Sequence, residues 1–159
     1  MYSFIEVINL KKSKISKVIS IILLIILVVG IGSLFFLPYL YDVFKGVNVE
    51  VFSKHTLLYQ IAFYSCYLIC LIILYKLIKL FNIVYKGNPF RIEVSNILKI
   101  NMILFMILFL IVIIKAIFIP TILSFAVALV CFIASLSFYV LSEVITSAIK
   151  YKNEVDLTV

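Results

Sequence analysis

The sequence predicts an all-α membrane protein of four transmembrane helices with both termini in the cytosol. Three observations support this prediction. The 159-residue chain is 66% hydrophobic and only 13% charged, which leaves too few polar groups to cover a soluble domain of this size. Its apolar residues fall into runs long enough to cross a bilayer. Its basic residues gather between these runs and near the chain ends, where they determine topology.

The first span is expected at residues 18–37. These twenty residues, rising about 1.5 Å each, give about 30 Å, the thickness of the hydrocarbon core. Gly30 and Gly32 interrupt the run, and such small residues permit the close approach of a second helix. The preceding head carries four lysines, and its apolar residues predict a stub lying on the inner membrane surface. The run is too long for a signal-peptide core, so we expect the head to stay attached.

An outer connection of moderate polarity follows at residues 38–56. It contains Asp42, Glu50 and His55, which together could form a metal site. Their spacing does not demand one, so we interpret the segment as a solvated loop.

The second span is expected at residues 57–75, and its helix should continue past the membrane. Cys66 and Cys70 lie four residues apart and therefore share one face of this helix. A metal or redox role is the alternative to consider here. Because no second pair of ligands lies nearby, we interpret both cysteines as small apolar residues.

A charged stretch at residues 76–98 separates the two apolar halves and is interpreted as a cytosolic elbow. Its centre holds the strongest turn signal of the chain, Gly87-Asn88-Pro89. Glycine permits positive φ there, and proline ends the preceding helix. Asn88 and Pro89 further predict the N-cap and first turn of the next helix.

The third span is expected at residues 99–118. Only thirteen apolar residues separate Asn101 from Lys115 within it. The Lys115 side chain is long enough to reach the outer head groups, so we place this residue near the outer interface. A buried functional lysine is the alternative.

The fourth span is expected at residues 122–141, after Pro120 breaks the helix and Thr121 caps the next one. One face of this span carries small residues that predict a packing surface for a neighbouring helix. They are Ser124, Ala128, Cys131 and Ser135. The cytosolic tail covers residues 142–159, and Glu143 at its start can face water or pair with an elbow lysine.

The distribution of basic residues sets the orientation. Eleven of the fourteen Lys and Arg residues fall in the head, the tail and the stretch from Lys76 to Lys99, which includes the elbow and the first residue of the third span. The positive-inside rule therefore places both termini on the cytosolic side of a cell membrane. We expect a single membrane domain, residues 1–159, arranged as a four-helix bundle in the lipid bilayer. The net charge of +7 is attributed to these topology signals, so no direct binding of nucleic acid is expected.

No catalytic constellation appears in the sequence, so an enzyme is not expected. A phosphate-binding glycine loop, a His-Glu-x-x-His motif and a Cys-x-x-Cys motif are all missing. Proton-coupled exporters of four spans need a carboxylate deep in the membrane, and none of the predicted spans contains one. Four-span thiol oxidases need exposed cysteine pairs on the outer side. No metal or other cofactor is expected.

Two motifs on the predicted cytosolic side point to a family. They are Lys86-Gly87-Asn88-Pro89-Phe90, followed by Asn96 and Leu98-Lys99-Ile100, and the terminal Glu154-Val155-Asp156-Leu157-Thr158-Val159. Together they resemble the signature of a bacterial family known as domain of unknown function 2975, whose members are small four-span membrane proteins. Val155 departs from that pattern, because the family usually has Asn there.

The resemblance implies no activity, since the family has none assigned. It implies a partner, because such proteins are often encoded beside a small helix-turn-helix DNA-binding regulator. The many residues with AT-rich codons, such as Ile, Lys and Asn, are compatible with a low-GC bacterium. A bacterial cell membrane is therefore the expected location.

Two functions follow as hypotheses. The first is a regulatory or interaction protein that holds the small regulator at the cytosolic face through six residues of the elbow and tail. They are Asn88, Pro89, Phe90, Asp156, Leu157 and Thr158. The simpler interpretation of the elbow is a helix turn whose lysines contact anionic lipid. The second hypothesis is a small transporter, pore or transporter accessory subunit, in which Lys115, Ser124 and Ser135 line a polar path in a homo-oligomer.

Overall fold

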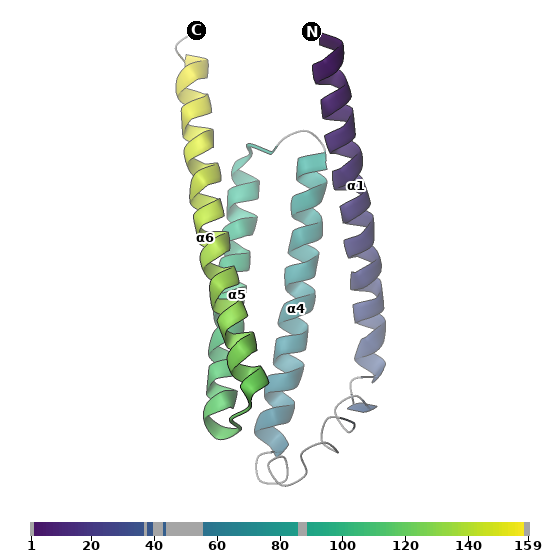
Figure 1. Ribbon diagram of the computed structural model, residues 1–159, viewed down its shortest axis with the longest axis vertical. Coiled ribbons are helices and arrows are strands. Elements are labelled where there is room, and N and C mark those ends of the chain that lie inside the picture. The colour runs from purple at the N-terminus through teal and green to yellow at the C-terminus, as the bar shows by residue number, and fades with distance from the viewer. Residues whose placement is uncertain (1, 37, 40–42, 44–55, 86–88, 158–159) are drawn as a thin grey trace.

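The computed structural model describes residues 2–36, 38–39, 43, 56–85 and 89–157. Within these residues the elements are α1 (Tyr2–Ser33), a short 3-10 helix η1 (Leu34–Phe36), α4 (Thr56–Tyr85), α5 (Ile92–Phe118) and α6 (Ile122–Leu157) (Figure 1). Four segments of the described chain are long and apolar enough to cross a membrane. These are Lys17–Phe36, Leu57–Val84, Ile92–Phe118 and Ile122–Glu154. The chain is therefore an all-helical, multi-pass membrane protein, as the sequence predicts.

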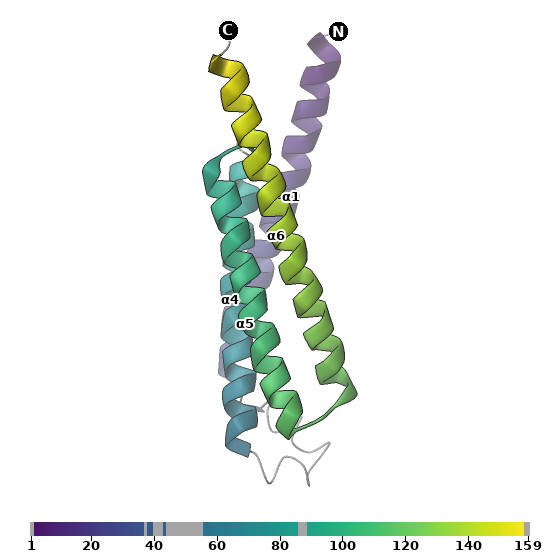
Figure 2. The ribbon, with the colours of Figure 1, turned by 90° about the vertical axis from the view of Figure 1, so that its left-hand side faces the viewer.

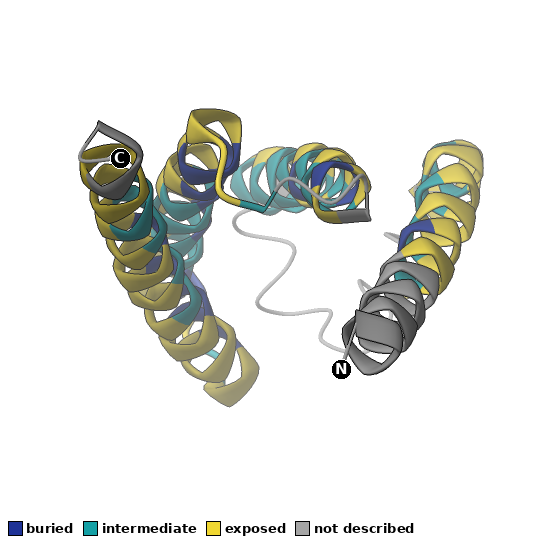
Figure 3. Cartoon of the chain, turned by 90° about the horizontal axis from the view of Figure 1, so that it is seen from above, coloured by how far each residue is buried: buried dark blue, intermediate teal, exposed yellow. Residues whose placement is uncertain are grey.

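The helices run alternately up and down, and each packs against the next long helix along the chain (Figures 1 and 2). α1 contacts α4, α4 contacts α5, and the interface of α5 with α6 is the most extensive. Seen along the helices, α1 and α6 lie at opposite edges of this row (Figure 3). Both ends of the chain and the α4–α5 turn lie at one end of the molecule, here named the terminal end. The opposite end, where α5 passes into α6, is named the far end.

The α5–α6 interface uses the predicted stripe of small residues on α6. Ser124, Ala128, Cys131 and Ser135 are all buried, which confirms this stripe as a packing face. The face continues to Ser142, which is fully buried. In a bilayer, an apolar side chain is buried about equally well against lipid or against another helix. Small residues therefore stabilise such interfaces in a different way, by letting the helix backbones approach closely. The Ser135 hydroxyl uses this proximity to donate a hydrogen bond to the Met102 carbonyl at 3.0 Å.

The α1–α4 interface is also built on a close approach. A Cβ atom at Gly30 would lie 2.7 Å from Cδ2 of Leu71, whereas one at Gly32 would meet nothing within 4 Å. Only Gly30 therefore serves the packing role predicted for both glycines. Nearer the terminal end, Ser20 Oγ donates a hydrogen bond to Asn82 Oδ1 at 2.8 Å. This polar contact holds α1 against α4 near the terminal end.

The starts of α5 and α6 differ in how well the sequence predicts them. The N-cap of α5 is Arg91, with extended backbone and no side-chain cap, so the prediction of Asn88 as N-cap was wrong. The two residues after Pro89 are not helical, and the helix begins at Ile92. The prediction for the other turn is confirmed, because the Ser124 amide donates to Thr121 Oγ1 at 3.3 Å.

The four long helices extend beyond the expected spans, as predicted for α4, and the largest extensions are those of α1 and α6. The head does not form a separate surface stub, because α1 is one helix from Tyr2. No Gly or Pro precedes Gly30 in this segment, so nothing in the sequence ends the helix between head and span. The tail is likewise helical to Leu157 as the continuation of α6. At the start of the tail, Glu143 pairs with Lys99 at 3.6 Å and is also about half exposed, so the pairing alternative and the exposed alternative both apply.

Candidate functional site

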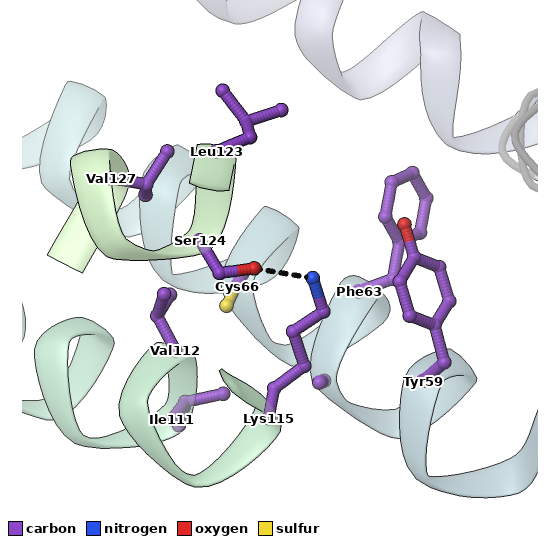
Figure 4. Close-up of a pocket in the computed structure, with 10 residues that line it drawn as sticks. Tyr59, Phe63, Cys66, Ile111, Val112, Lys115, Leu123, Ser124 and Val127 are labelled. Carbon is purple, nitrogen blue, oxygen red and sulfur yellow. Dashed lines mark hydrogen bonds between the residues drawn. The ribbon is translucent and has the colours of Figure 1, made fainter. Parts of the chain in front are cut away.

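A small cavity lies near the far end between α4, α5 and α6 (Figure 4). Its volume is about 160 Å³. Its walls are almost entirely apolar and aromatic, and they contain one charged group. The lining residues are Tyr59, Ala62, Phe63 and Cys66 from α4, Ile111, Val112 and Lys115 from α5, and Leu123, Ser124 and Val127 from α6. The site therefore combines one cation with apolar surface from three helices.

The Lys115 ammonium group is held by two neighbours. Its Nζ donates a hydrogen bond to Ser124 Oγ at 2.7 Å and lies 5.2 Å from the ring centroid of Tyr59. The second contact is a cation–π interaction, in which the negative ring face attracts the ammonium group. Within the described part of the chain, no carboxylate forms an ion pair with Lys115. An ammonium group carries three hydrogen-bond donors, so Lys115 can also donate to an oxygen atom of a ligand.

The local sequence explains why Lys115 and Ser124 meet. Lys115 lies in the last turn of α5, where the helix dipole favours a cation. The chain then reverses through Pro120, and Thr121 caps α6 one turn before Ser124. The Ser124 hydroxyl lies 2.5 Å from Thr121 Oγ1, so it can donate there while it accepts from Lys115. A single turn thus fixes both the cation and its acceptor.

The direction of the Lys115 side chain differs from the one expected. The residue lies one turn from the end of α5. Its ammonium group, however, turns toward Ser124 inside the cavity (Figure 4). The sequence predicts Ser124 as a packing residue or, in the transporter hypothesis, as part of a polar path with Lys115, but not as the direct acceptor of the Lys115 ammonium group. The sequence feature that could have indicated this contact is a lysine before and a serine after the turn at Pro120.

The elbow residues predicted to bind a partner lie at the terminal end. Pro89 is half-buried, and the Phe90 side chain is 52% exposed. Asn88 lies outside the described residues. Phe90 is therefore an aromatic group accessible beside the α4–α5 turn.

The tail residues predicted to act with the elbow lie further out. Asp156 and Leu157 belong to the α6 helix, although their side chains are outside the described part, as is the whole of Thr158. The end of α6 lies beyond the α4–α5 turn (Figures 1 and 2). The helical part of the tail thus extends past the described elbow residues Pro89 and Phe90 (Figure 1).

Metal and thiol chemistry find little support in the described residues. No group of three His, Cys, Asp or Glu side chains gathers within them. The three cysteines are free thiols in different settings: Cys66 lines the cavity, Cys70 is exposed, and Cys131 is in the core. The remaining candidates, Asp42, Glu50 and His55, lie outside the described residues.

Asn101 is a polar residue whose burial was not predicted. Its side chain is fully buried in α5, and neither amide atom has a hydrogen-bond partner among the described residues. The signal in the sequence was its helical spacing from Val94 and Leu98, which are also buried. An unpaired amide of this kind marks a site of reduced stability or of bound water.

Comparison with known proteins identified no relative whose activity could guide a proposal for this chain. No family model, curated protein or solved structure matches the chain.

Proposed function

We propose that the protein is a membrane-embedded regulatory protein that holds a small helix-turn-helix DNA-binding partner at the cytosolic face. The observation that carries the proposal is the continuation of α6 as one helix to Leu157, past the α4–α5 turn (Figure 1). α6 has 36 residues, whereas about 20 suffice to cross a bilayer. The additional turns are available to bind another protein.

The register between α5 and α6 supports this projection. Ser95 and Thr146 share a hydrogen bond of 2.7 Å, and Lys99 pairs with Glu143. In this antiparallel register, the start of α5 at Ile92 lies level with about residue 149 of α6. The rest of α6 then extends about 12 Å further at about 1.5 Å per residue.

The projecting segment has the side chains of a docking surface. Residues 150–154 are all exposed. Tyr151 is 70% exposed and stands between Lys150 and Lys152. Aromatic side chains are common anchors of protein interfaces, and the flanking lysines favour a partner with acidic residues. Tyr151 also shares a face with Val144, which would extend the contact along α6.

The orientation and the partner rest on the sequence. The head, elbow and tail carry most of the basic residues, so the terminal end is assigned to the cytosol. The resemblance to domain of unknown function 2975 supports a bacterial cell membrane and a small helix-turn-helix regulator as partner. Phe90 in the elbow offers a second aromatic contact at the same end of the molecule.

The test is crosslinking of the tagged full chain in its native membranes, followed by affinity capture and mass spectrometry. We expect recovery of a small helix-turn-helix protein, and loss of that protein after Tyr151→Ala or removal of residues 154–159. Membrane insertion should be unchanged in both variants. The matched control is Tyr75→Ala, because Tyr75 is also exposed but lies within α4, well before that helix ends at Tyr85, and so outside the projecting segment of α6. Undiminished recovery from both tail variants would overturn the proposal.

The transporter alternative draws less support from the geometry. Ser135 would have to line a polar path, yet it is 1% exposed and donates its hydrogen bond to Met102. The cavity at Lys115, at about 160 Å³, is smaller than the roughly 300–1,000 Å³ typical of small-molecule sites. We therefore do not adopt this function.

A further inference from the structure

The cavity at Lys115 opens on the surface that faces lipid. Leu123 and Val127 line it and are both exposed on α6. α4 and α6 both pack on α5, so the cavity lies in the groove between them, with part of α5 beneath (Figure 4). A molecule dissolved in the membrane can therefore enter it from the side.

The charge of the cavity selects for an anion. Lys115 is the single charged group in its lining, and no described carboxylate pairs with it. A cation among apolar side chains is costly to keep without a counter-charge, so this lining favours an anion beside Lys115. The Lys115 ammonium group uses one of its three hydrogen-bond donors on Ser124 Oγ. The others are available to an anionic oxygen.

The size and walls of the cavity select for a hydrocarbon chain. A volume of about 160 Å³ holds part of one acyl chain, not a whole drug-sized solute. Phe63 on α4 and Val127 on α6 provide apolar contact on opposite sides. The ligand therefore has an anionic group at one end and hydrocarbon next to it.

The depth of Lys115 agrees with a lipid head group. The residue lies three positions before the end of α5, which is about 4.5 Å along the helix axis. Basic pockets between membrane helices at the cytoplasmic face bind the head groups of anionic lipids, and the same attraction of a cation for a lipid phosphate applies at the opposite face. Such lipids surround the protein at high local concentration, so even a modest affinity fills the site.

We propose that this groove binds an anionic phospholipid of the surrounding bilayer, with its phosphate on Lys115 and one acyl chain against Phe63 and Val127. The site is at the far end, away from the projecting part of α6. The inference therefore goes beyond the proposed function, and its test can fail without affecting the partner assay.

The experiment uses tryptophan fluorescence of the full chain in vesicles. The chain contains no tryptophan, so Phe63→Trp places a single reporter in the cavity wall. Brominated phosphatidylglycerol, an anionic lipid, is compared as quencher with brominated phosphatidylcholine at the same mole fraction. One lysine near the head groups favours the anionic lipid about fivefold. We expect this preference at Phe63→Trp and its loss on adding Lys115→Gln.

Matched variants separate the site from general attraction to the basic protein. Adding Lys115→Arg should keep the preference, and Lys99→Gln, which removes a charge at the terminal end, should leave it unchanged. The reporter Phe125→Trp, on the exposed face of α6, should show no preference. Adding Ala62→Leu fills the cavity and should reduce quenching of Phe63→Trp by both lipids.

Several outcomes would overturn the inference. Equal quenching of Phe63→Trp by the two lipids would exclude selection of an anion. A preference that survives Lys115→Gln would assign it to other charges, and Lys115→Met serves as a second neutral variant if the first does not fold. Stronger quenching by a brominated fatty acid than by phosphatidylglycerol would identify a free fatty acid as the ligand in place of the phospholipid.

Discussion

The Tyr67 hydroxyl of α4 donates a hydrogen bond to the Gly30 carbonyl of α1 at 2.8 Å. Ser33 also donates to this carbonyl at 2.8 Å, so one oxygen receives both groups. Backbone carbonyls in a helix are normally screened by the side chains around them. The missing side chain at Gly30 brings α4 close enough for this contact, and α1 has no other extensive interface among the described helices.

Replacing Gly30 with a larger residue should loosen α1 from the other helices. In Gly30→Leu the Cβ would lie 2.7 Å from Leu71 Cδ2, and the rest of the side chain would push α4 away. Overpacking of this kind costs about 1–3 kcal/mol. The measurement is the rate of disulfide formation between cysteines introduced at Ser20 and Asn82, which are in contact across this interface.

The control for this prediction is Gly32→Leu. A Cβ at Gly32 meets nothing within 4 Å, so crosslinking should proceed at the rate of the parent protein. Equal slowing by both substitutions would mean that helix propensity or insertion, and not contact with α4, is responsible.

Enlarging Ser135 should destabilise the α5–α6 pair. Ser135 is buried against Met102, whereas Ser137, two residues later, is exposed. Ser135→Leu should lower the free energy of unfolding by about 1–3 kcal/mol, because the backbones cannot approach as closely. Ser137→Leu should change it by less than about 0.5 kcal/mol. Unfolding by a denaturing detergent measures both, and a similar effect of the two substitutions would contradict the packing role.

The sequence was sufficient to predict the features that depend on composition and helical periodicity. Long apolar runs predict the four membrane-spanning segments, because backbone groups in lipid must be satisfied within each helix. The stripe from Ser124 to Ser135 predicts a packing face, since residues at this spacing lie on one side of a helix. These inferences need no knowledge of which helix lies opposite.

Features that depend on a neighbouring helix could not be predicted. The direction of Lys115 is decided by Ser124 and Tyr59, and the latter belongs to a distant segment of the chain. The burial of Asn101 also depends on the packing of neighbouring helices, which the hydropathy of the sequence does not reveal. The start of α5 at Ile92 was missed because proline signals a turn but does not fix how many residues follow before the helix begins.

The ion pair between Lys99 and Glu143 should contribute little to stability. Both side chains are about half exposed, and their charged atoms lie 3.6 Å apart. Exposed pairs of this kind typically contribute about 0.2–1 kcal/mol. A double-mutant cycle of Lys99→Gln and Glu143→Gln should therefore give a coupling energy below about 1 kcal/mol. A larger value would indicate that the bilayer shields this pair from water.

Replacing Asn101 with an apolar residue of similar branching should not destabilise the protein. Both amide atoms are buried without a partner among the described residues, and such a group costs about 1–3 kcal/mol. Asn101→Leu removes this cost, so the free energy of unfolding should stay constant or rise by up to that amount. Asn96→Leu is the control, because Asn96 is exposed on the same helix and should give no gain. A loss of more than about 1 kcal/mol in Asn101→Leu would instead show that a buried water or a bound ligand satisfies the amide, since its removal would then break existing hydrogen bonds.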